Sequence, residues 1–293
     1  MQSIIEGIDK KRLQIDIDNL SNCDKLIERG EFVVYLSEAK NLPNILKEIG
    51  RLRELTFRAV GEGTGKAYDL DEYDQYFSNL FIWDKKNQAI AGGYRVGLGD
   101  EIFEKYGVKG FYIDSLFDID KSAFPLLYES VELGRSYIVE NYQRAYLPFF
   151  LLWQGILVFW LKNPQYKHLI GPVSISKYYS DISKSLMVAF AKKFFLCNKY
   201  AGSFQPKTPF AVDLEEIDLE EIDGSTMRDL EKFLLKIEPT HLRVPTMIKQ
   251  YAKLNARFLS FNIDPNFSDA LDGLMLLNLN DVPENIIQLL QEK

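Results

Sequence analysis

The sequence is poor in cysteine and histidine. Its 293 residues contain two cysteines, Cys23 and Cys197, far apart and in no CxxC pair, and two isolated histidines, His168 and His241. This scarcity argues against a disulfide framework or a zinc cluster and fits a reducing cytosol. No Cys or Ser stands with a His as a covalent nucleophile requires. We therefore expect no metal and no covalently bound cofactor.

Long hydrophobic runs and a signal peptide are also missing. The most apolar run, 149–161, has 13 residues, whereas a membrane-spanning helix needs about 20. We interpret this run as a core helix, with an interfacial helix as the alternative. Residues 1–6 lack the basic and apolar regions of a secretion signal. These features favour a cytoplasmic location.

The charge of the chain is negative overall but unevenly distributed. The net charge of −7 argues against a general nucleic-acid binder. Residues 141–210 nevertheless carry nine Lys and Arg against one acid, and residues 211–232 carry nine acids against two basic residues. The basic block favours an acidic partner or an anionic surface, although a solvated lysine face or folding of the acidic segment over it explains it as well.

Apolar periodicity predicts an alternation of strands and helices. We expect strands at 32–36, 111–116, 130–139, 168–176, 257–263 and 271–279, a hairpin over 80–98, and helices at 41–58, 147–161, 181–195 and 244–254. The glycine-rich loop 61–65 follows no strand, so we do not interpret it as a phosphate-binding loop. The order predicts one α/β domain over 1–293, a mixed sheet with helices on both faces. An N-terminal extension (about 1–30) and an acidic insert (about 211–240) flank or interrupt it.

The segment 131–136, VELGRS, is the most informative one. It places the carboxylate of Glu132 and the guanidinium of Arg135 three residues apart in an apolar strand. Burying such charges is costly unless both have partners, and this cost is typical of a functional site. We therefore expect Glu132 and Arg135 to belong to one.

Several further motifs accompany this segment in a fixed order. They are RELTFR (53–58), DEYD (71–74), NLFIWD (79–84), GGYRV (92–96), WQGI (153–156), LIGPVS (169–174) and NIDPNF (262–267). Together with VELGRS they resemble the acyl-carrier-protein-dependent N-acyltransferases of lyso-ornithine lipid and glycine lipid synthesis, often called hemolysin-like. That family is related to acyl-homoserine-lactone synthases. The resemblance covers about residues 45–180 and 244–282 and implies a GNAT-like (acyl-CoA N-acyltransferase) fold.

The resemblance also implies a set of site residues. These are Arg53, Phe57, Asp71, Asp74, Arg95, Glu132 and Arg135, to which we add Ser174 at the end of LIGPVS as a substrate-binding residue. The chain departs from the family at Asn79, where a His is usual, and at Tyr137, where a Cys often follows the serine. The acidic insert has no counterpart in the family. These departures leave position 79 and the insert without a role.

Amide formation from a thioester needs a neutral amine, a proton acceptor and stabilisation of an oxyanion. We expect Glu132 to be the base, with a salt bridge to Arg135 or Arg95 as the structural alternative. Arg95 and Arg135, the other two catalytic candidates, suit a bidentate contact to a substrate carboxylate. Asp71 and Asp74 either hold the cationic amine or cap a helix. Without a covalent nucleophile, direct attack by the amine is preferred.

The segment after VELGRS bears on the acyl donor. Residues 141–146 contain no glycine, whereas acetyl-CoA enzymes of this fold usually have a glycine-rich pyrophosphate loop there. This favours acyl-phosphopantetheine on acyl carrier protein over acyl-CoA. We expect the acidic carrier protein to dock on Lys177, Lys184, Lys192 and Lys193, unless these form a plain solvated face. The aromatic residues Phe149, Phe150, Phe159 and Trp160 either wall an acyl tunnel or pack in the core.

The sequence thus predicts an N-acyltransferase. It would move a long (3-hydroxy)acyl chain from acyl carrier protein to the α-amine of glycine or ornithine in aminolipid synthesis. The alternatives are an acyl-homoserine-lactone synthase and a non-catalytic GNAT-fold binding module. An amphiphilic product favours a cytoplasmic protein peripheral to the inner face of the cytoplasmic membrane.

Overall fold

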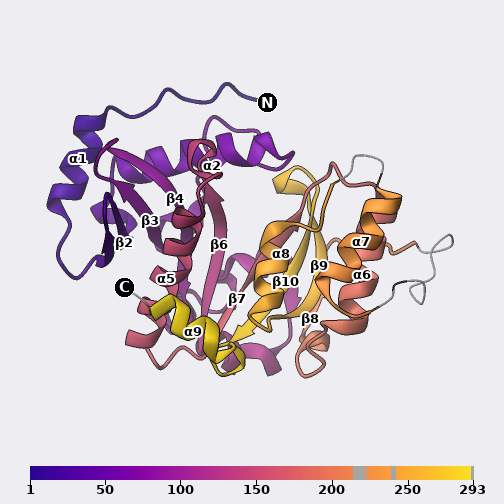
Figure 1. Ribbon diagram of the computed structural model, residues 1–293. Coiled ribbons are helices and arrows are strands. Elements are labelled where there is room, and N and C mark those ends of the chain that lie inside the picture. Colours follow the sequence, from indigo (N-terminus) through magenta and orange to yellow (C-terminus); the bar gives the residue numbers. More distant parts are fainter. Residues whose placement is uncertain (214–221, 223, 239–241, 292–293) are drawn as a thin grey trace.

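The structure is a computed structural model that describes residues 1–213, 222, 224–238 and 242–291 (Figure 1). Within this part of the chain, eight strands form a mixed sheet in the order β1-β2-β3-β4-β6-β7-β10-β9, and β5 pairs with β8 separately. The strands are β1 (Lys25–Arg29), β2 (Phe32–Glu38), β3 (Ser78–Asp84), β4 (Ala89–Leu98), β5 (Phe117–Ile119), β6 (Ser130–Ile138), β7 (His168–Ile175), β8 (Phe204–Pro206), β9 (Arg257–Asp264) and β10 (Ala270–Asn278).

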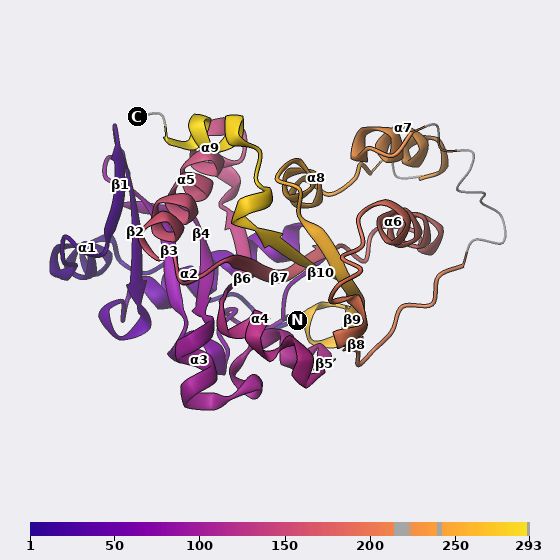
Figure 2. The ribbon, with the colours of Figure 1, turned by 90° about the horizontal axis from the view of Figure 1, so that it is seen from below.

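Helices cover both faces of the large sheet. They are α1 (Lys10–Asn19), α2 (Ile45–Ala59), α3 (Gly99–Tyr106), α4 (Phe124–Tyr128), α5 (Tyr146–Lys162), α6 (Asp181–Phe194), α7 (Met227–Ile237), α8 (Thr246–Lys253) and α9 (Glu284–Gln291). Short 3-10 helices, of which η2 (Glu72–Gln75), η4 (Tyr112–Ser115) and η9 (Pro265–Phe267) bear on the site, lie in the connections. Figure 2 shows α5 and α9 on one side of the strands and α3 and α4 on the other.

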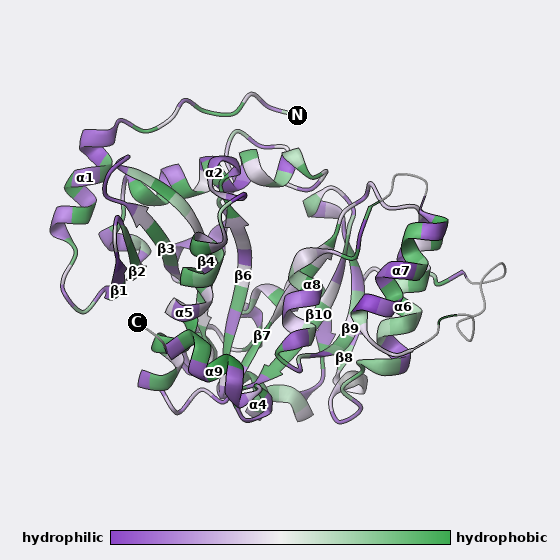
Figure 3. Cartoon of the chain, viewed as in Figure 1, coloured by the Kyte–Doolittle hydropathy of each residue, from purple (hydrophilic) through white to green (hydrophobic). Residues whose placement is uncertain are grey.

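The two faces follow from the alternation of side chains along the strands. On β3, Leu80 and Ile82 join the core cluster that includes α5, whereas Phe81 and Trp83 join the cluster that includes α2. Green, apolar segments recur along the central strands in Figure 3, between polar ones. This arrangement confirms the predicted α/β fold with a mixed sheet and helices on both faces.

Most predicted elements are found close to their expected bounds. The 80–98 hairpin is β3 and β4, and its turn is closed by Asp84, whose carboxylate accepts hydrogen bonds from the backbone N–H and the side-chain amide of Asn87 (3.0 and 2.7 Å). β6 and β7 are parallel neighbours, and α5 makes the crossover that parallel strands require. Phe149, Phe150, Phe159 and Trp160 on α5 all pack in the core cluster, as the core-packing interpretation expects.

The strand predicted at 111–116 is wrong. This segment turns into η4, because the backbone N–H groups of Tyr112 and Ile113 both donate to the buried carboxylate of Glu132 (3.0 and 2.9 Å). Phe111, Ile113 and Leu116 are buried. The apolar residues therefore reflect burial of a tight turn, and the strand begins only at Phe117.

Residues 1–30, expected as an extension, pack on the main body. The buried carboxylate of Asp16 in α1 accepts hydrogen bonds from the backbone N–H groups of Asn44 and Ile45 (2.7 and 2.8 Å). It thereby supplies the cap that Asn44, at the N-terminus of α2, does not provide with its own side chain. The first helix thus fixes the start of α2, the helix that carries Arg53 and Phe57.

The acidic insert is described only in part. Residues 214–221, 223, 239 and 240 of the predicted range lie outside the described residues. Within it, α7 buries Leu230 and Leu234 and lies beside α6 (Figures 1 and 2). Among the described residues, no helix has the length and apolar character needed to cross a membrane.

Candidate active site

The parallel strands β6 and β7 diverge at the centre of the large sheet, and we call this divergence the fork. β6 and β7 pair in parallel only from Ser130↔His168 to Glu132↔Ile170, and both strands continue beyond these pairs. At the apex, a Cβ on Gly171 would lie 2.0 Å from the carbonyl oxygen of Leu133, so only glycine allows the backbones to approach this closely. Beyond the apex the two strands enclose a cavity.

Arg135 enters this cavity through a bulge in β6. The β4–β6 register advances two residues from Gly93 to Arg95 but three from Gly134 to Tyr137. Arg135 lies at the bulge and has a φ of 52°. This left-handed conformation costs about 1 to 3 kcal/mol for a residue other than glycine, and such strain is typical of functional positions.

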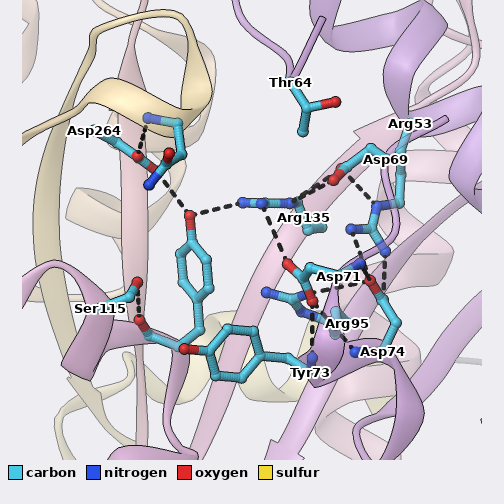
Figure 4. Close-up of polar contacts among 12 residues, drawn as sticks. Arg53, Thr64, Asp69, Asp71, Tyr73, Asp74, Arg95, Ser115, Arg135 and Asp264 are labelled. Carbon is cyan, nitrogen blue, oxygen red and sulfur yellow. Dashed lines mark hydrogen bonds and ion pairs between the residues drawn. The ribbon is translucent and has the colours of Figure 1, made fainter. Parts of the chain in front are cut away.

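Three arginines and three aspartates form a closed ring of ion pairs around this bulge (Figure 4). Each aspartate bridges two guanidinium groups. Asp69 contacts Arg53 and Arg135 (2.9 and 3.0 Å), Asp74 contacts Arg53 and Arg95 (2.7 and 3.3 Å), and Asp71 contacts Arg95 and Arg135 (2.6 and 3.6 Å). The ring is neutral as a whole, so it satisfies the partner requirement of its buried charges.

Aromatic rings cover the guanidinium groups of the ring. Arg95 lies over Tyr73, Phe77 and Tyr112, with centroid distances of 5.4, 5.3 and 5.0 Å. Arg135 lies over Tyr112 and Phe267, at 4.8 and 4.6 Å. Cation–π contacts of this kind strengthen when water is excluded. They hold both side chains in one orientation.

The electrostatics of the ring favour the charged forms of Asp69, Asp71 and Arg135. Burial alone would raise the pKa of Asp69, but the guanidinium groups of Arg135 and Arg53 outweigh it and hold that pKa below its usual value. The pKa of Asp71 is lowered in the same way, with Arg95 the largest opposing influence to burial. Despite its burial, Arg135 has a pKa raised well above its usual value, chiefly by Asp69. Asp71 also caps η2 by accepting from the backbone N–H of Tyr73 (3.0 Å), as its helix-capping interpretation expects.

The structure brings most of the predicted site residues together but gives them different surroundings. Arg135, Phe57 and Ser174 line a cavity of about 500 Å³ at the fork. Arg53, Arg95, Asp71 and Asp74 do not line it and belong to the ring behind Arg135. Asn79 is buried on β3 opposite Arg95.

Glu132 lies at the base of the fork and outside the cavity lining. Its two carboxylate oxygens accept the N–H groups of Tyr112 and Ile113, and within the described residues no ion pair joins it to Arg95 or Arg135. Burial raises its pKa to about 7, although the nearby Arg95 acts in the opposite direction. In this structure the carboxylate anchors η4, which positions the Tyr112 ring between the two arginines.

The cavity walls are mostly apolar, with a few polar groups. Its apolar and aromatic lining consists of Phe57, Ala59, Val60, Tyr94, Leu133, Pro172, Val173, Tyr178, Tyr179, Leu242, Pro245, Met247, Tyr251 and Phe267. Its lining carboxylates are Glu62 and Asp272. No Cys or His is among the lining residues that the structure describes. Volume and composition are those of a small-molecule site.

Sequence reasoning missed Glu62, Asp69 and Asp272. Asp272 had a readable signal, because it is a lone carboxylate in the apolar segment 271–279, the same feature that drew attention to Glu132. Glu62 stands in the glycine-rich loop 61–65 and gave none. Asp69 lies two residues before the DEYD motif. Its role depends on Arg53 and Arg135, which are distant in sequence.

The four predicted docking lysines do not form one cluster. Lys177 is exposed beside Tyr178 at the cavity, whereas Lys192 and Lys193 are exposed at the far end of α6, about 20 Å away along a 14-residue helix. The side chain of Lys184 is 12% exposed and pairs with Asp181 (3.1 Å). Of the four, Lys177 lies beside a residue that lines the cavity.

Parts or all of the chain are similar to known proteins. A family model described as an acetyltransferase (GNAT) domain matches residues 52–154, a range that holds the whole ion-pair ring. Glycine N(alpha)-acyltransferases from Phocaeicola vulgatus and Bacteroides thetaiotaomicron are each 27% identical to this chain, over 300 and 303 residues. The alignments cover 97% of this chain and 91% and 88% of the two relatives. The protein is a GNAT-fold acyltransferase.

Solved structures resemble the acyltransferase more loosely. The CoA-dependent acyl-homoserine lactone synthase MesI aligns with a TM-score of 0.39 at 11% identity, over 88% of this chain and 93% of that one. The acyl-homoserine lactone synthase LasI aligns with a TM-score of 0.34 at 12% identity, over 56% and 79%. The matched domain range, 52–154, ends before β7, β9 and β10. Ser174 and Asp272 therefore lie outside it.

Proposed function

We propose that this acyltransferase joins a long acyl chain to the α-amine of glycine, producing an N-acyl amino acid for aminolipid synthesis. The observation that carries the proposal is the cavity at the β6–β7 fork, whose walls are mostly apolar and which places Arg135, Glu62 and Asp272 along one lining. An acyl chain suits the apolar walls, and a guanidinium suits the carboxylate of an amino acid. The relatives named glycine N(alpha)-acyltransferase support glycine over ornithine.

The fork also suits a thioester donor. The β6–β7 ladder ends at Glu132, so the segment 133–136 faces the cavity. An extended pantetheine arm, which contains amides, can add to a strand edge of this kind. The connection from β6 to α5, residues 139–145, contains no glycine, which supports a donor carried on acyl carrier protein over free acyl-CoA. Lys177, exposed beside the cavity, then becomes the preferred docking contact among the four lysines.

The proposed reaction is direct aminolysis. The neutral amine of glycine attacks the thioester carbonyl, the C–N bond forms, and the C–S bond breaks with release of the thiol. Arg135 orients the glycine carboxylate so that the amine meets the thioester, and the ion-pair ring holds the guanidinium in place. We propose a cytoplasmic protein peripheral to the inner membrane face, because the product is amphiphilic.

The test is a reconstituted reaction with defined donors. Purified protein is incubated with 3-hydroxypalmitoyl carrier protein or the matching CoA thioester, and with glycine, ornithine or S-adenosylmethionine. Products are identified by mass spectrometry. We expect N-acylglycine, formed faster from the carrier protein. An acyl-homoserine lactone, or no amide from any pair with a folded sample, would refute the proposal.

Arg135→Gln gives a second arm of this test. If the guanidinium binds the glycine carboxylate, the KM for glycine rises in the variant, and glycine methyl ester, which lacks that charge, is affected much less. A matched control is Arg257→Gln on β9, because Arg257 is exposed and lies outside the cavity lining. Equal losses with glycine and its ester would argue against the proposed carboxylate contact.

A further inference from the structure

Two carboxyl groups, one buried and one partly buried, face the cavity without a cation of their own. Asp272 on β10 is 2% exposed, and Glu62 lies in the loop after α2. Arg135, which lines the same cavity, already pairs with Asp69 and Asp71. Among the described residues, no ion pair involves Glu62 or Asp272. A buried carboxylate in this position is costly until it gains a proton or a cation.

The strand register fixes the orientation of Asp272. Asp272 and Ser174 face each other in the β7–β10 ladder, and the Ser174 hydroxyl donates to Oδ1 of Asp272 (2.7 Å). Both residues line the cavity. Ser174 therefore holds one carboxylate oxygen in a set direction, as a proton-accepting group requires.

Burial, modified by nearby charges, brings the pKa of both carboxyl groups close to neutrality. Burial raises the pKa of Asp272 to about 7. The Ser174 hydrogen bond and Arg135 oppose this rise, and Asp264 on β9 adds to it. Burial likewise raises the pKa of Glu62 to about 8, with Asp272 acting in the same direction and Arg135 against it. Near pH 7 Glu62 is therefore mostly protonated, whereas Asp272 is partly ionised and can accept a proton.

We propose that Asp272, oriented by Ser174 and paired with Glu62, is the group that takes the proton from the incoming amine. This inference rests on the proposed function. The ammonium group enters as the missing cation, Asp272 takes one of its protons, and the neutral amine attacks the thioester carbon. When the C–S bond breaks, the second proton lost from nitrogen goes to the thiolate, so one amide, one thiol and one proton result.

Asp272 and Glu132, the residue that the sequence favoured as the base, differ in position and contacts. Both have a pKa raised to about 7, so proton affinity alone does not distinguish them. Glu132 has both oxygens occupied by backbone N–H groups and lies outside the cavity lining, whereas Asp272 lines the cavity. A base must come within hydrogen-bond reach of the proton it removes. Asp272 can meet this requirement for an amine bound in the cavity, and Glu132 has the contacts of a positioning residue.

The experiment measures the pH dependence of acyl transfer in Asp272→Asn and Ser174→Ala. Wild-type kcat/KM should rise through a limb near pH 7. Asp272→Asn should lower it about 100-fold or more and abolish this limb, the usual effect of losing a general base. Ser174→Ala removes a hydrogen bond to the ionised form, so its limb should move to higher pH. Asp118→Asn, at a residue 78% exposed on β5, is the matched control and should match wild type.

A second acceptor distinguishes a chemical defect from a folding defect. Aminooxyacetate resembles glycine, but its amine is already neutral at pH 7 and needs no base. Asp272→Asn should therefore lose much less activity with aminooxyacetate than with glycine. Equal losses with both acceptors, or an unchanged pH limb in Asp272→Asn or Ser174→Ala, would overturn the inference while leaving wild-type glycine acylation intact. Absence of glycine acylation in wild type would instead refute the proposed function.

Discussion

Asp69 joins Arg53 and Arg135 in the ion-pair ring, and we predict that removing its charge causes a large loss of stability. Asp69→Asn preserves the size of the side chain but removes the charge that lies 2.9 Å from Nε of Arg53 and 3.0 Å from Nε of Arg135. The two arginine side chains are 1% and 10% exposed, so water cannot replace the lost partner. Breaking a buried ion pair on one side costs about 3 to 5 kcal/mol. A typical domain has a total stability of about 5 to 15 kcal/mol.

The assay is urea unfolding followed by circular dichroism, with an exposed ion pair as the control. Glu129→Gln makes the same change from carboxylate to amide, but Glu129 and Lys167 are 41% and 53% exposed and 2.7 Å apart. Exposed pairs of this kind contribute about 1 kcal/mol or less. We expect the midpoint of Asp69→Asn to fall well below that of Glu129→Gln at an unchanged slope. Equal midpoints would refute the view that the ring holds the fold together.

The same variant has a defined pH signature. The pKa of Asp69 is below its usual value of 3.8 in the folded protein. Its contribution to stability is therefore complete above that value and is lost as the pH falls through the lower folded-state pKa. The stability gap between wild type and Asp69→Asn should shrink as the pH approaches 3 and below. A gap that stays constant into acid would show that the aspartate acts by shape alone.

Three further predictions concern the fork, its buried carboxyl group and its entrance. Gly171→Ala should lower the free energy of unfolding in urea by about 1 to 3 kcal/mol, because its Cβ would clash with the Leu133 carbonyl oxygen. Gly134→Ala has open space around its Cβ and should be nearly neutral. Equal losses in the two variants would contradict the close approach of β6 and β7 at Gly171. The pKa of Asp272 is about 7 in the folded protein, whereas the usual value of an aspartate is 3.8. The free energy of unfolding of the wild type should therefore fall as the pH rises from about 4 to 7. Asp272→Asn should remove on the order of 1 to 4 kcal/mol of that fall. An equal fall in unfolding free energy for both proteins would contradict it. Lys177→Glu should raise the KM for a carrier-protein thioester but not for a pantetheine thioester, and Lys192→Glu should change neither; equal effects would remove the docking assignment.

The elements that could be predicted from sequence are those with a strong local pattern. The 80–98 hairpin and the helix at 147–161 follow from alternation and from continuous apolar character, and β3, β4 and α5 confirm them. α1 was missed because its sequence is mostly polar, and α7 was missed because it lies in the segment interpreted as an acidic insert. Their few buried residues, such as Leu13 and Leu230, become meaningful only when the partner surface is known.

For the candidate site, the sequence indicated which residues belong to it but not which of them contact each other. Sequence motifs pointed to Arg53, Asp71, Asp74, Arg95 and Arg135, and the structure gathers all of them in one ring. The sequence did not show that the aspartates neutralise the arginines, because such pairing depends on tertiary distances.

The proton-accepting pair depends on long-range structure even more strongly. Glu62 and Asp272 are more than 200 residues apart in the chain, and only the fork brings them to one cavity. The burial that gives these groups their raised pKa values is also a property of the assembled sheet. A pattern within either segment therefore could not have indicated the pair.

The contacts within the ring indicate which of its guanidinium groups is able to bind a substrate carboxylate. Nε and Nη2 of Arg95 lack hydrogen-bond partners within the described chain, but its side chain is 1% exposed and enclosed by aromatic rings. Arg135 lines the cavity, is 10% exposed, and has two loose contacts, with Asp71 at 3.6 Å and the Tyr112 hydroxyl at 3.2 Å. A carboxylate can displace these contacts while the 3.0 Å pair with Asp69 keeps the side chain anchored. Under the proposed function we therefore expect Arg135 to be the member that binds the substrate carboxylate, with Arg53 and Arg95 holding the aspartates that position it.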